Sequence, residues 1–193
     1  MMIYKAILTT VLVGAAPFTY ADGGMSAFGF VIGKPLDLPA CKYSEFLKYD
    51  GAQEKTCIEP EDKNSPSYRS IHFSPEDRPA LLSTNGVTGT LIDGILEGLN
   101  FGTLGYSSKD QTLATLVEKY GKPTRITDRK LQNRNGAKFD TYIAEWDNLD
   151  LYVEFTPTFY DSLKEGFLSI ETPKGRQHRL DQIKNLPPVG KAL

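Results

Sequence analysis

YSSKDQTLATLVEKYGKPT, residues 106–124, is the stretch that decides the fold. Its pattern predicts a helix over residues 109–120, because four apolar positions follow the i, i+3, i+4, i+7 spacing of one buried stripe: Leu113, Leu116, Val117 and Tyr120. Ser108 with Gln111 predicts a capping box at the start of the helix. Gly121 is expected to end the helix as a left-handed cap.

Four strands are predicted downstream of this helix, over residues 125–131, 139–146, 149–156 and 167–171. Asn135-Gly136 and Asp147-Asn148 are turn signals between the first three, so consecutive strands are expected to pair antiparallel. A closing helix is predicted over residues 175–186, with its apolar residues on one side: Leu180, Ile183 and Leu186.

Upstream of the helix, strands are predicted over residues 27–32, 68–73, 87–92 and 95–101. The last two flank Asp93-Gly94, a dipeptide typical of a two-residue hairpin turn. Strands, then a helix, then a connected sheet predict an α+β fold: an antiparallel sheet of hairpins and a meander, one helix packed on it and a C-terminal helix. The chain lacks alternating strands and helices and a glycine-rich phosphate loop, which argues against a doubly wound fold.

Residues 1–21 are predicted to be a signal peptide, with a positively charged start, an apolar run and cleavage before Asp22. The run is shorter than the ~20 residues that a membrane-spanning helix needs. No cysteine lies at the cleavage point, so we expect neither a membrane span nor a lipid anchor. Residues 22–193 are expected to form one domain, in which a strand and loop region, 22–105, precedes the helix, meander and closing helix of 106–193.

Cys41 and Cys57 are the two cysteines of the chain. An exported protein meets oxidising conditions, so we expect these residues to form a disulfide. Closing a loop of this length stabilises the fold by about 3 kcal/mol in the chain-entropy model. In the alternative, one of the two is a reactive thiol.

The charge balance argues against nucleic acid as a partner. Lysine and arginine number 22 and aspartate and glutamate 24, and they are scattered along the chain, so no basic surface is expected. Two histidines and two bonded cysteines are too few for an ordinary four-ligand zinc site. We therefore expect no metal and no cofactor.

Sequence motifs for catalysis are also missing: the chain has no G-x-S-x-G, S-x-x-K or H-E-x-x-H pattern. His72 and His178 are predicted to be surface or structurally bonded histidines. A glycosidase needs two carboxylates, for which Asp93 with Glu97, or Glu145 with Asp147 and Asp150, could serve. Among 24 acidic residues, however, chance alone produces such pairs. We predict that the protein is not an enzyme.

A two-residue turn at Asp147-Asn148 would set the register of the strands on either side, with Trp146 opposite Leu149 on the core face. The other face would carry three apolar groups and three carboxylates: Phe139, Ile143, Tyr152, Glu145, Asp150 and Glu154. If uncovered, this face predicts a hydrophobic patch with an acidic rim that binds another protein, for which a basic partner is suited. In the alternative, the closing helix covers the face and its basic residues pair with the carboxylates: Arg176, Arg179 and Lys184.

The segment 106–124 followed by a meander resembles the helix, Gly-x-Pro and sheet unit of small secreted bacterial proteins, such as the beta-lactamase inhibitor protein and the small lipoproteins of outer-membrane assembly. The resemblance covers about half of the chain after residue 21 and implies a binding module rather than an enzyme. The chain differs from these lipoproteins because it lacks the anchoring cysteine, and from the inhibitor because it shows no tandem duplication.

These observations lead to one main hypothesis. The protein is expected to be an exported bacterial binding protein, periplasmic or secreted, that acts by protein–protein contact as an inhibitor, immunity factor or envelope accessory. Two alternatives stay open: a cell-envelope hydrolase that uses His72 or an acidic pair, and a structural envelope component that assembles with itself or with lipoproteins.

Overall fold

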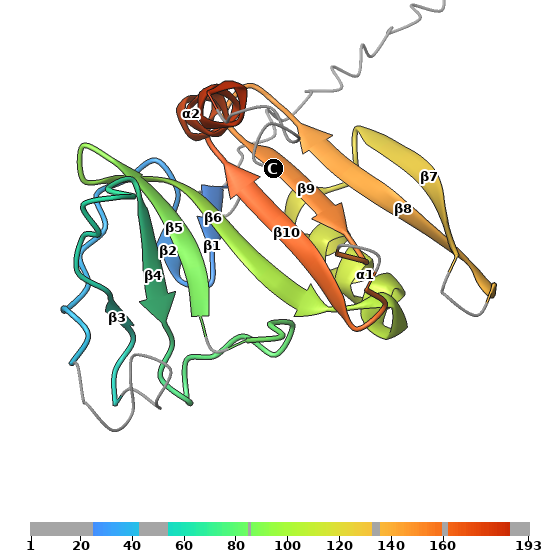
Figure 1. Cartoon of the computed structure of the whole chain (residues 1–193), viewed down its shortest axis with the longest axis horizontal. Helices are drawn as coiled ribbons and strands as arrows, with labels where there is room; N and C mark the ends of the chain where they lie inside the picture. Colours follow the sequence, from blue (N-terminus) through green and yellow to red (C-terminus); the bar gives the residue numbers. More distant parts are fainter. Residues whose placement is uncertain (1–24, 43–53, 85, 133–135, 160–161, 186–193) are drawn as a thin grey trace, which may run out of the picture.

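The computed structural model describes residues 25–42, 54–84, 86–132, 136–159 and 162–185. It contains an eight-stranded antiparallel sheet with the strand order β3-β4-β5-β6-β10-β9-β8-β7 (Figure 1). This confirms the predicted α+β fold. The strands are β3 Cys57–Ile58, β4 Tyr68–His72, β5 Gly86–Ile92, β6 Ile95–Leu104, β7 Arg125–Gln132, β8 Lys138–Asp147, β9 Tyr152–Thr156 and β10 Glu165–Glu171.

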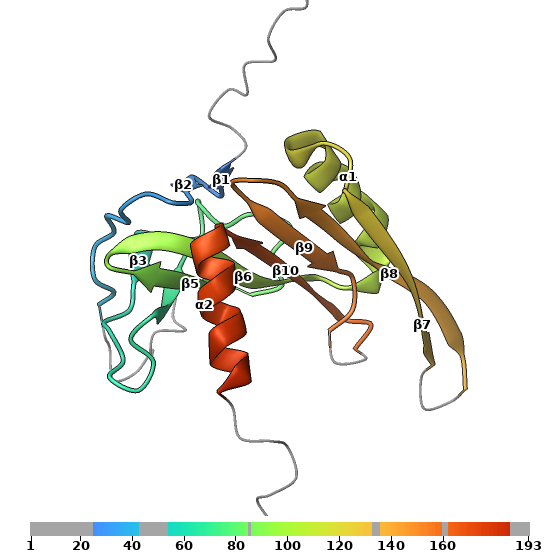
Figure 2. The same cartoon turned by 90° about the horizontal axis from the view of Figure 1, so that it is seen from above.

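Two four-stranded meanders make up this sheet. The first, β3 to β6, joins the second, β7 to β10, where β6 pairs with β10 along a register that runs from Gly98 opposite Glu171 to Leu104 opposite Glu165. A helix follows each meander: α1, Lys109–Tyr120, and α2, Pro173–Lys184. The two helices lie on opposite faces of the sheet (Figure 2).

The hydrophobic core lies on the α1 face. Alternate residues of the central strands point to that side, among them Leu99, Phe155 and Leu168, each with no exposed surface. From α1, Leu116 packs into this core. Trp146 also anchors the helix, because its indole Nε1 donates to the carbonyl of Gly121 at 2.7 Å.

Helix α1 has the predicted bounds. The helix ends at Gly121 as predicted, and the Gly121 N–H donates to the carbonyl of Val117. Gly121 has the positive φ that favours glycine, 78°, but its ψ of −166° differs from that of the left-handed cap expected from the sequence. The capping box is wrong: the Ser108 hydroxyl donates to the carbonyl of Gly105 instead. The physical reason is a short 3-10 helix, Tyr106–Ser108, which runs directly into α1 and places Ser108 within a continuing helical turn.

The Asp93-Gly94 hairpin between β5 and β6 is confirmed, with φ angles of 54° and 77° at the two turn residues. The single strand predicted over residues 27–32 is wrong. Phe28 and Gly29 also have positive φ, so this segment folds into a small hairpin of β1, Ser26–Ala27, and β2, Phe30–Val31.

The register predicted for β8 and β9 is wrong as well. Trp146 lies opposite Val153, and Leu149, at 93% exposure, lies in the loop between the strands instead of facing Trp146. Asn148 causes the difference, because its side-chain oxygen accepts hydrogen bonds from the backbone N–H groups of Asp150 and Leu151 and makes a longer loop. The pairing shifts by an even number of residues, so the side chains that lie within β8 and β9 keep their predicted faces, whereas Leu149 and Asp150 leave the sheet.

Cys41 and Cys57 form the predicted disulfide, which ties the segment before residue 43 to β3. The predicted signal peptide lies outside the described residues. In the part of the chain that is described, no helix has the length and apolar character needed to cross a membrane.

Helix α2 begins at Pro173, with Thr172 as its N-cap accepting a hydrogen bond from the N–H of Gly175 at 3.0 Å. Its expected apolar side does not face the sheet, since Leu180 is 39% and Ile183 is 53% exposed; Leu186 lies outside the described residues. The helix instead contacts the sheet through Gly175 and arginines, so we call the side of the sheet that it crosses the α2 face.

Candidate binding site

One row of side chains crosses most of the α2 face, because the strand register aligns one residue from each of seven strands. The first half of the row is made of hydroxyls and an amide, and the second half of charged groups: Ser70, Thr88, Asn100, Ser169, Glu154, Glu145 and Arg125. The edges of the sheet bend toward this face, and α2 occupies only one end of it (Figures 1 and 2). The face therefore offers a neutral half and a charged half.

The charged half is centred on the phenol of Tyr152, which is 5% exposed. The hydroxyl lies 2.9 Å from Glu145 Oε1 and 2.7 Å from Glu154 Oε2. Burial and these two carboxylates raise the pKa of Tyr152 above its ordinary value, so the phenol stays protonated and can donate. The guanidinium of Arg176 lies 3.6 Å from the centre of the Tyr152 ring, a cation–π contact.

Arginines of the chain itself pair with the surrounding carboxylates. Arg125 hydrogen-bonds both oxygens of Glu145, and this contact, partly opposed by burial, lowers the pKa of Glu145 below its ordinary value. From α2, Arg176 binds Asp147 at 3.0 Å. Arg179, the second arginine of α2, forms a bidentate ion pair with Glu171 of β10, which is 1% exposed.

In the alternative expectation, the closing helix covers this face and its basic residues pair with Glu145, Asp150 and Glu154. Arg176 and Arg179 do reach this side of the sheet, but they pair with Asp147 and Glu171, and Lys184 lies 3.5 Å from Asp181 of its own helix. Glu145 pairs with Arg125 of β7 instead. Tyr152 and Glu145 are buried.

Three of the predicted binding residues, Tyr152, Glu145 and Glu154, come together, and Ile143 lies half-buried on the same face. Two others lie apart from them. The ring of Phe139 packs edge to face on that of Tyr106, with 5.6 Å between the ring centres. Asp150 lies in the exposed loop between β8 and β9. The docking role of all six residues stays a prediction.

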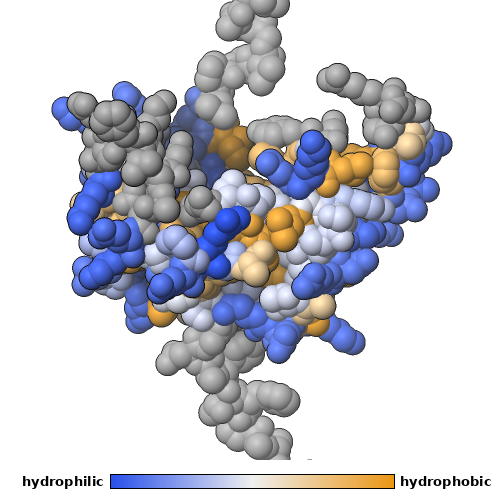
Figure 3. Space-filling model, turned by 90° about the horizontal axis from the view of Figure 1, so that it is seen from below, coloured by the Kyte–Doolittle hydropathy of each residue, from blue (hydrophilic) through white to orange (hydrophobic). Residues whose placement is uncertain are grey.

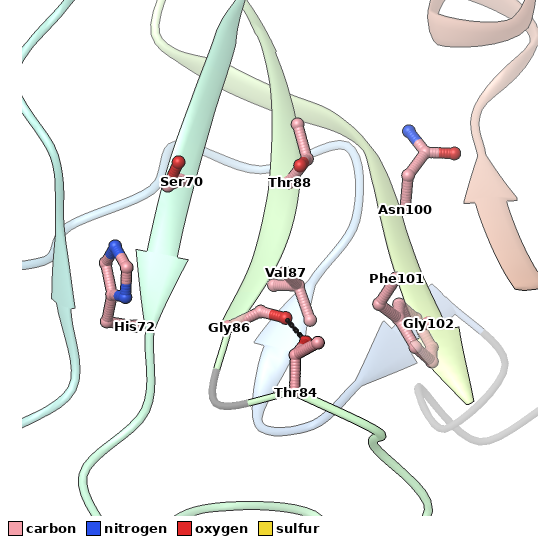
Figure 4. Close-up of a pocket in the computed structure, with 9 residues that line it drawn as sticks. All are labelled: Ser70, His72, Thr84, Gly86, Val87, Thr88, Asn100, Phe101 and Gly102. Atoms are coloured by element: carbon pink, nitrogen blue, oxygen red, sulfur yellow. Dashed lines mark hydrogen bonds between the residues drawn. The ribbon is translucent and has the colours of Figure 1, made fainter. Parts of the chain in front are cut away.

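A pocket of about 360 Å³ lies in the neutral half of the α2 face, over β4, β5 and β6 (Figure 4). Three of its polar side chains stand side by side on these strands: Ser70, Thr88 and Asn100. Gly86 and Gly102 also line the pocket. A loop residue, Thr84, lines it as well, and the Thr84 hydroxyl donates to the carbonyl of Gly86 at 2.9 Å.

His72 lines the same pocket and is held by a carboxylate. Its Nε2 lies 2.7 Å from Oε1 of Glu59, and the two side chains are 12% and 26% exposed. Glu59 lies directly after β3, and β4 holds its backbone in place because Nε of Arg69 donates to the Glu59 carbonyl at 2.7 Å. An imidazole oriented by a carboxylate can exchange protons with a bound molecule.

Sequence reasoning did not find this pocket. The alternation of the strand predicted over 68–73 does place Ser70 and His72 on one face, and that signal was available. A two-residue turn at Asp93-Gly94 would by itself pair Asn100 with Val87, but the register shifts at Thr90/Leu91 and pairs Asn100 with Thr88 beside the pocket. Glu59 meets His72 through the pairing of β3 with β4, which no turn signal indicates.

No protein-family model, curated protein or solved structure matches this chain. The resemblance to small secreted bacterial proteins thus stays a prediction. Fold and site together define an α+β protein whose antiparallel sheet carries a hydrophobic core on one face and a polar, partly uncovered surface on the other. Among the described residues, no group of three or more histidine, cysteine or acidic side chains could hold a metal ion.

Proposed function

We propose that the protein is an exported binding protein that holds a partner protein on the α2 face and acts by occluding it, as an inhibitor, immunity factor or envelope accessory does. The observation that carries this proposal is the limited reach of α2. Its contacts lie at one end of the strands. These contacts are Gly175 with Glu97, Arg179 with Glu171, and His178 with Tyr68. We propose that the partner binds the rest of the face, beyond this end.

The surface around the face suits a protein partner of mixed character. At the end opposite α2, Leu104 and Phe159 are 45% and 37% exposed, and Phe159 stacks on Phe167 of the α2 face. Figure 3 shows apolar surface at this end, bordered by hydrophilic side chains. Apolar groups beside polar ones are the usual composition of a protein interface.

Charge supports a basic partner less than the sequence suggested. Glu145, Asp147 and Glu171 are each paired with an arginine of the chain itself. We therefore expect shape and hydrogen bonds on the α2 face, more than net charge, to select the partner.

Export is supported by the disulfide, because such bonds persist outside the reducing cytoplasm. The leader-like pattern of residues 1–21 supports the same compartment, periplasmic or secreted.

Capture of partners by the oxidised protein tests the proposal. We expect wild-type protein to retain a specific protein from envelope or culture extracts, and Thr88→Lys to weaken its binding by roughly tenfold or more, because the long cation would project from the neutral half of the α2 face. Thr115→Lys is the matched control: the same change at an exposed site on α1, which should leave binding unchanged. Failure to retain any protein, or equal binding by both variants, would contradict the proposal.

A second candidate function is hydrolysis in the pocket, which the 2.7 Å contact between His72 and Glu59 favours. If the pocket is catalytic, His72→Ala should abolish turnover of an ester, amide or glycoside substrate. The matched control is the other histidine of the chain: His178→Ala should keep full activity. No turnover by the wild type with any of the three substrate classes would exclude this candidate.

A further inference from the structure

Several buried polar atoms around the pocket have no hydrogen-bond partner among the described residues. These atoms are Oδ1 of Asn100, a residue that lines the pocket; Oγ of Ser169, which lies across the β6–β10 pair from Asn100; and Oγ of Ser83, which lies above Gly102. Buried polar atoms are nearly always paired in native proteins, because each unpaired group costs about 1–3 kcal/mol. Such atoms gathered beside one pocket are what a site that hydrogen-bonds a ligand would require.

The lining excludes strongly charged and apolar ligands. Its polar side chains are hydroxyls, an amide and an imidazole, and it contains no lysine, arginine or carboxylate. His72 faces the carboxylate of Glu59, so it does not supply a lone positive charge for an anion. The two apolar lining residues, Val87 and Phe101, are only 4% and 3% exposed and belong to the core of the α1 face.

An extended peptide is also a poor fit. β4, β5 and β6 already pair with one another through their backbones, so they cannot take up a further strand. What the pocket offers is side-chain groups that both donate and accept hydrogen bonds. A molecule rich in neutral hydroxyl groups presents the matching set.

We propose that this pocket binds a neutral saccharide. Hydroxyls of the sugar would bond to Ser70 and Thr88, and the amide nitrogen of Asn100, which Figure 4 shows on the side of Thr88, would donate to a sugar oxygen. At about 360 Å³ the cavity is near the small end of ligand sites, ~300–1,000 Å³, which suits one or two sugar units. The pocket lies within the α2 face, so this proposal shares a surface with the docking proposal, but it rests on different observations: the pocket lining and the buried polar atoms without partners.

The test measures binding of neutral monosaccharides and disaccharides to the oxidised full-length protein by calorimetry and ligand-observed NMR, with glucuronate, glucosamine and a short uncharged peptide as the other probes. We expect a neutral sugar to bind, and Thr88→Val to weaken that binding roughly three- to tenfold through loss of one hydrogen bond. Thr127→Val is the matched control, because Thr127 is exposed on the same face but lies on β7 outside the pocket.

Asn100→Leu separates a ligand role from a structural one. Because it removes a buried oxygen that has no partner among the described residues, we expect thermal stability to be unchanged or raised while sugar affinity falls at least tenfold. The proposal is overturned if no neutral sugar binds, if the charged sugars or the peptide bind better, or if Thr127→Val weakens binding as much as Thr88→Val. Capture of a partner protein through the α2 face would not by itself show whether the pocket binds a sugar.

Discussion

Replacing Tyr152 with alanine is expected to lower the free energy of unfolding by about 3–5 kcal/mol, the usual cost of truncating a buried aromatic side chain. The ring is 5% exposed beneath the guanidinium of Arg176, and its hydroxyl contacts Glu145 and Glu154. Truncation leaves a cavity and also brings two carboxylates together without the donor between them. Urea unfolding followed by the fluorescence of Trp146, the single tryptophan, measures the change.

Tyr152→Phe is the matched variant, because it keeps the ring under Arg176 and removes only the hydroxyl. We expect a smaller loss, about 1–3 kcal/mol, from the carboxylates left without their shared donor. An alanine variant within about 0.5 kcal/mol of wild type would contradict this account. Such a result would mean that Tyr152 is an exposed anchor, as the patch expected from the sequence requires.

Features set by neighbouring residues were predictable from the sequence. The α1 bounds follow from its apolar stripe and Gly121, and the β5–β6 turn follows from Asp93-Gly94. In AFGFVI the apolar alternation predicted a strand, but two positive φ angles at Phe28 and Gly29 turned it into a hairpin. Hydropathy does not report backbone geometry at a residue such as Phe28.

Long-range features were not predictable. Strand alternation correctly grouped Glu145, Tyr152 and Glu154 on one face. A shift of the register by an even number of residues does not change which face a side chain is on. The pairing of β6 with β10 joins residues 61 to 73 positions apart in the chain, from Leu104 with Glu165 to Gly98 with Glu171, and it sets Asn100 beside Ser169. The candidate pocket lies over β4, β5 and β6, and Asn100 joins it through the register shift between β5 and β6, which the Asp93-Gly94 turn does not predict.

Helix α2 shows most clearly why an apolar stripe can mislead. The stripe through Leu180 and Ile183 faces away from the sheet, while Gly175 is buried against the backbone of β6 at Glu97. A Cβ at position 175 would lie closer to the Glu97 carbonyl than real Cβ atoms come to any neighbour. Helix α2 can therefore pack this closely on β6 only because residue 175 has no side chain.

This geometry gives the second large prediction. Helix propensity favours alanine over glycine by about 1 kcal/mol, so propensity alone predicts that Gly175→Ala stabilises the protein. We expect the opposite, a loss of about 3 kcal/mol, because α2 must move away from Glu97 and the pairing of Arg179 with buried Glu171 is weakened. The sign of the change therefore separates packing from propensity.

Thermal and urea unfolding of Gly175→Ala should be compared with Gln177→Ala, an exposed α2 position whose side chain bonds only Asp181 in the same helix among the contacts described. The control should stay within about 0.5 kcal/mol of wild type. A Gly175→Ala protein as stable as wild type would show that α2 does not rest on β6 as described. Because Arg176 reaches Tyr152 from the same helix, a displaced α2 should also reduce the cost of Tyr152→Ala, and a double-mutant cycle measures that coupling.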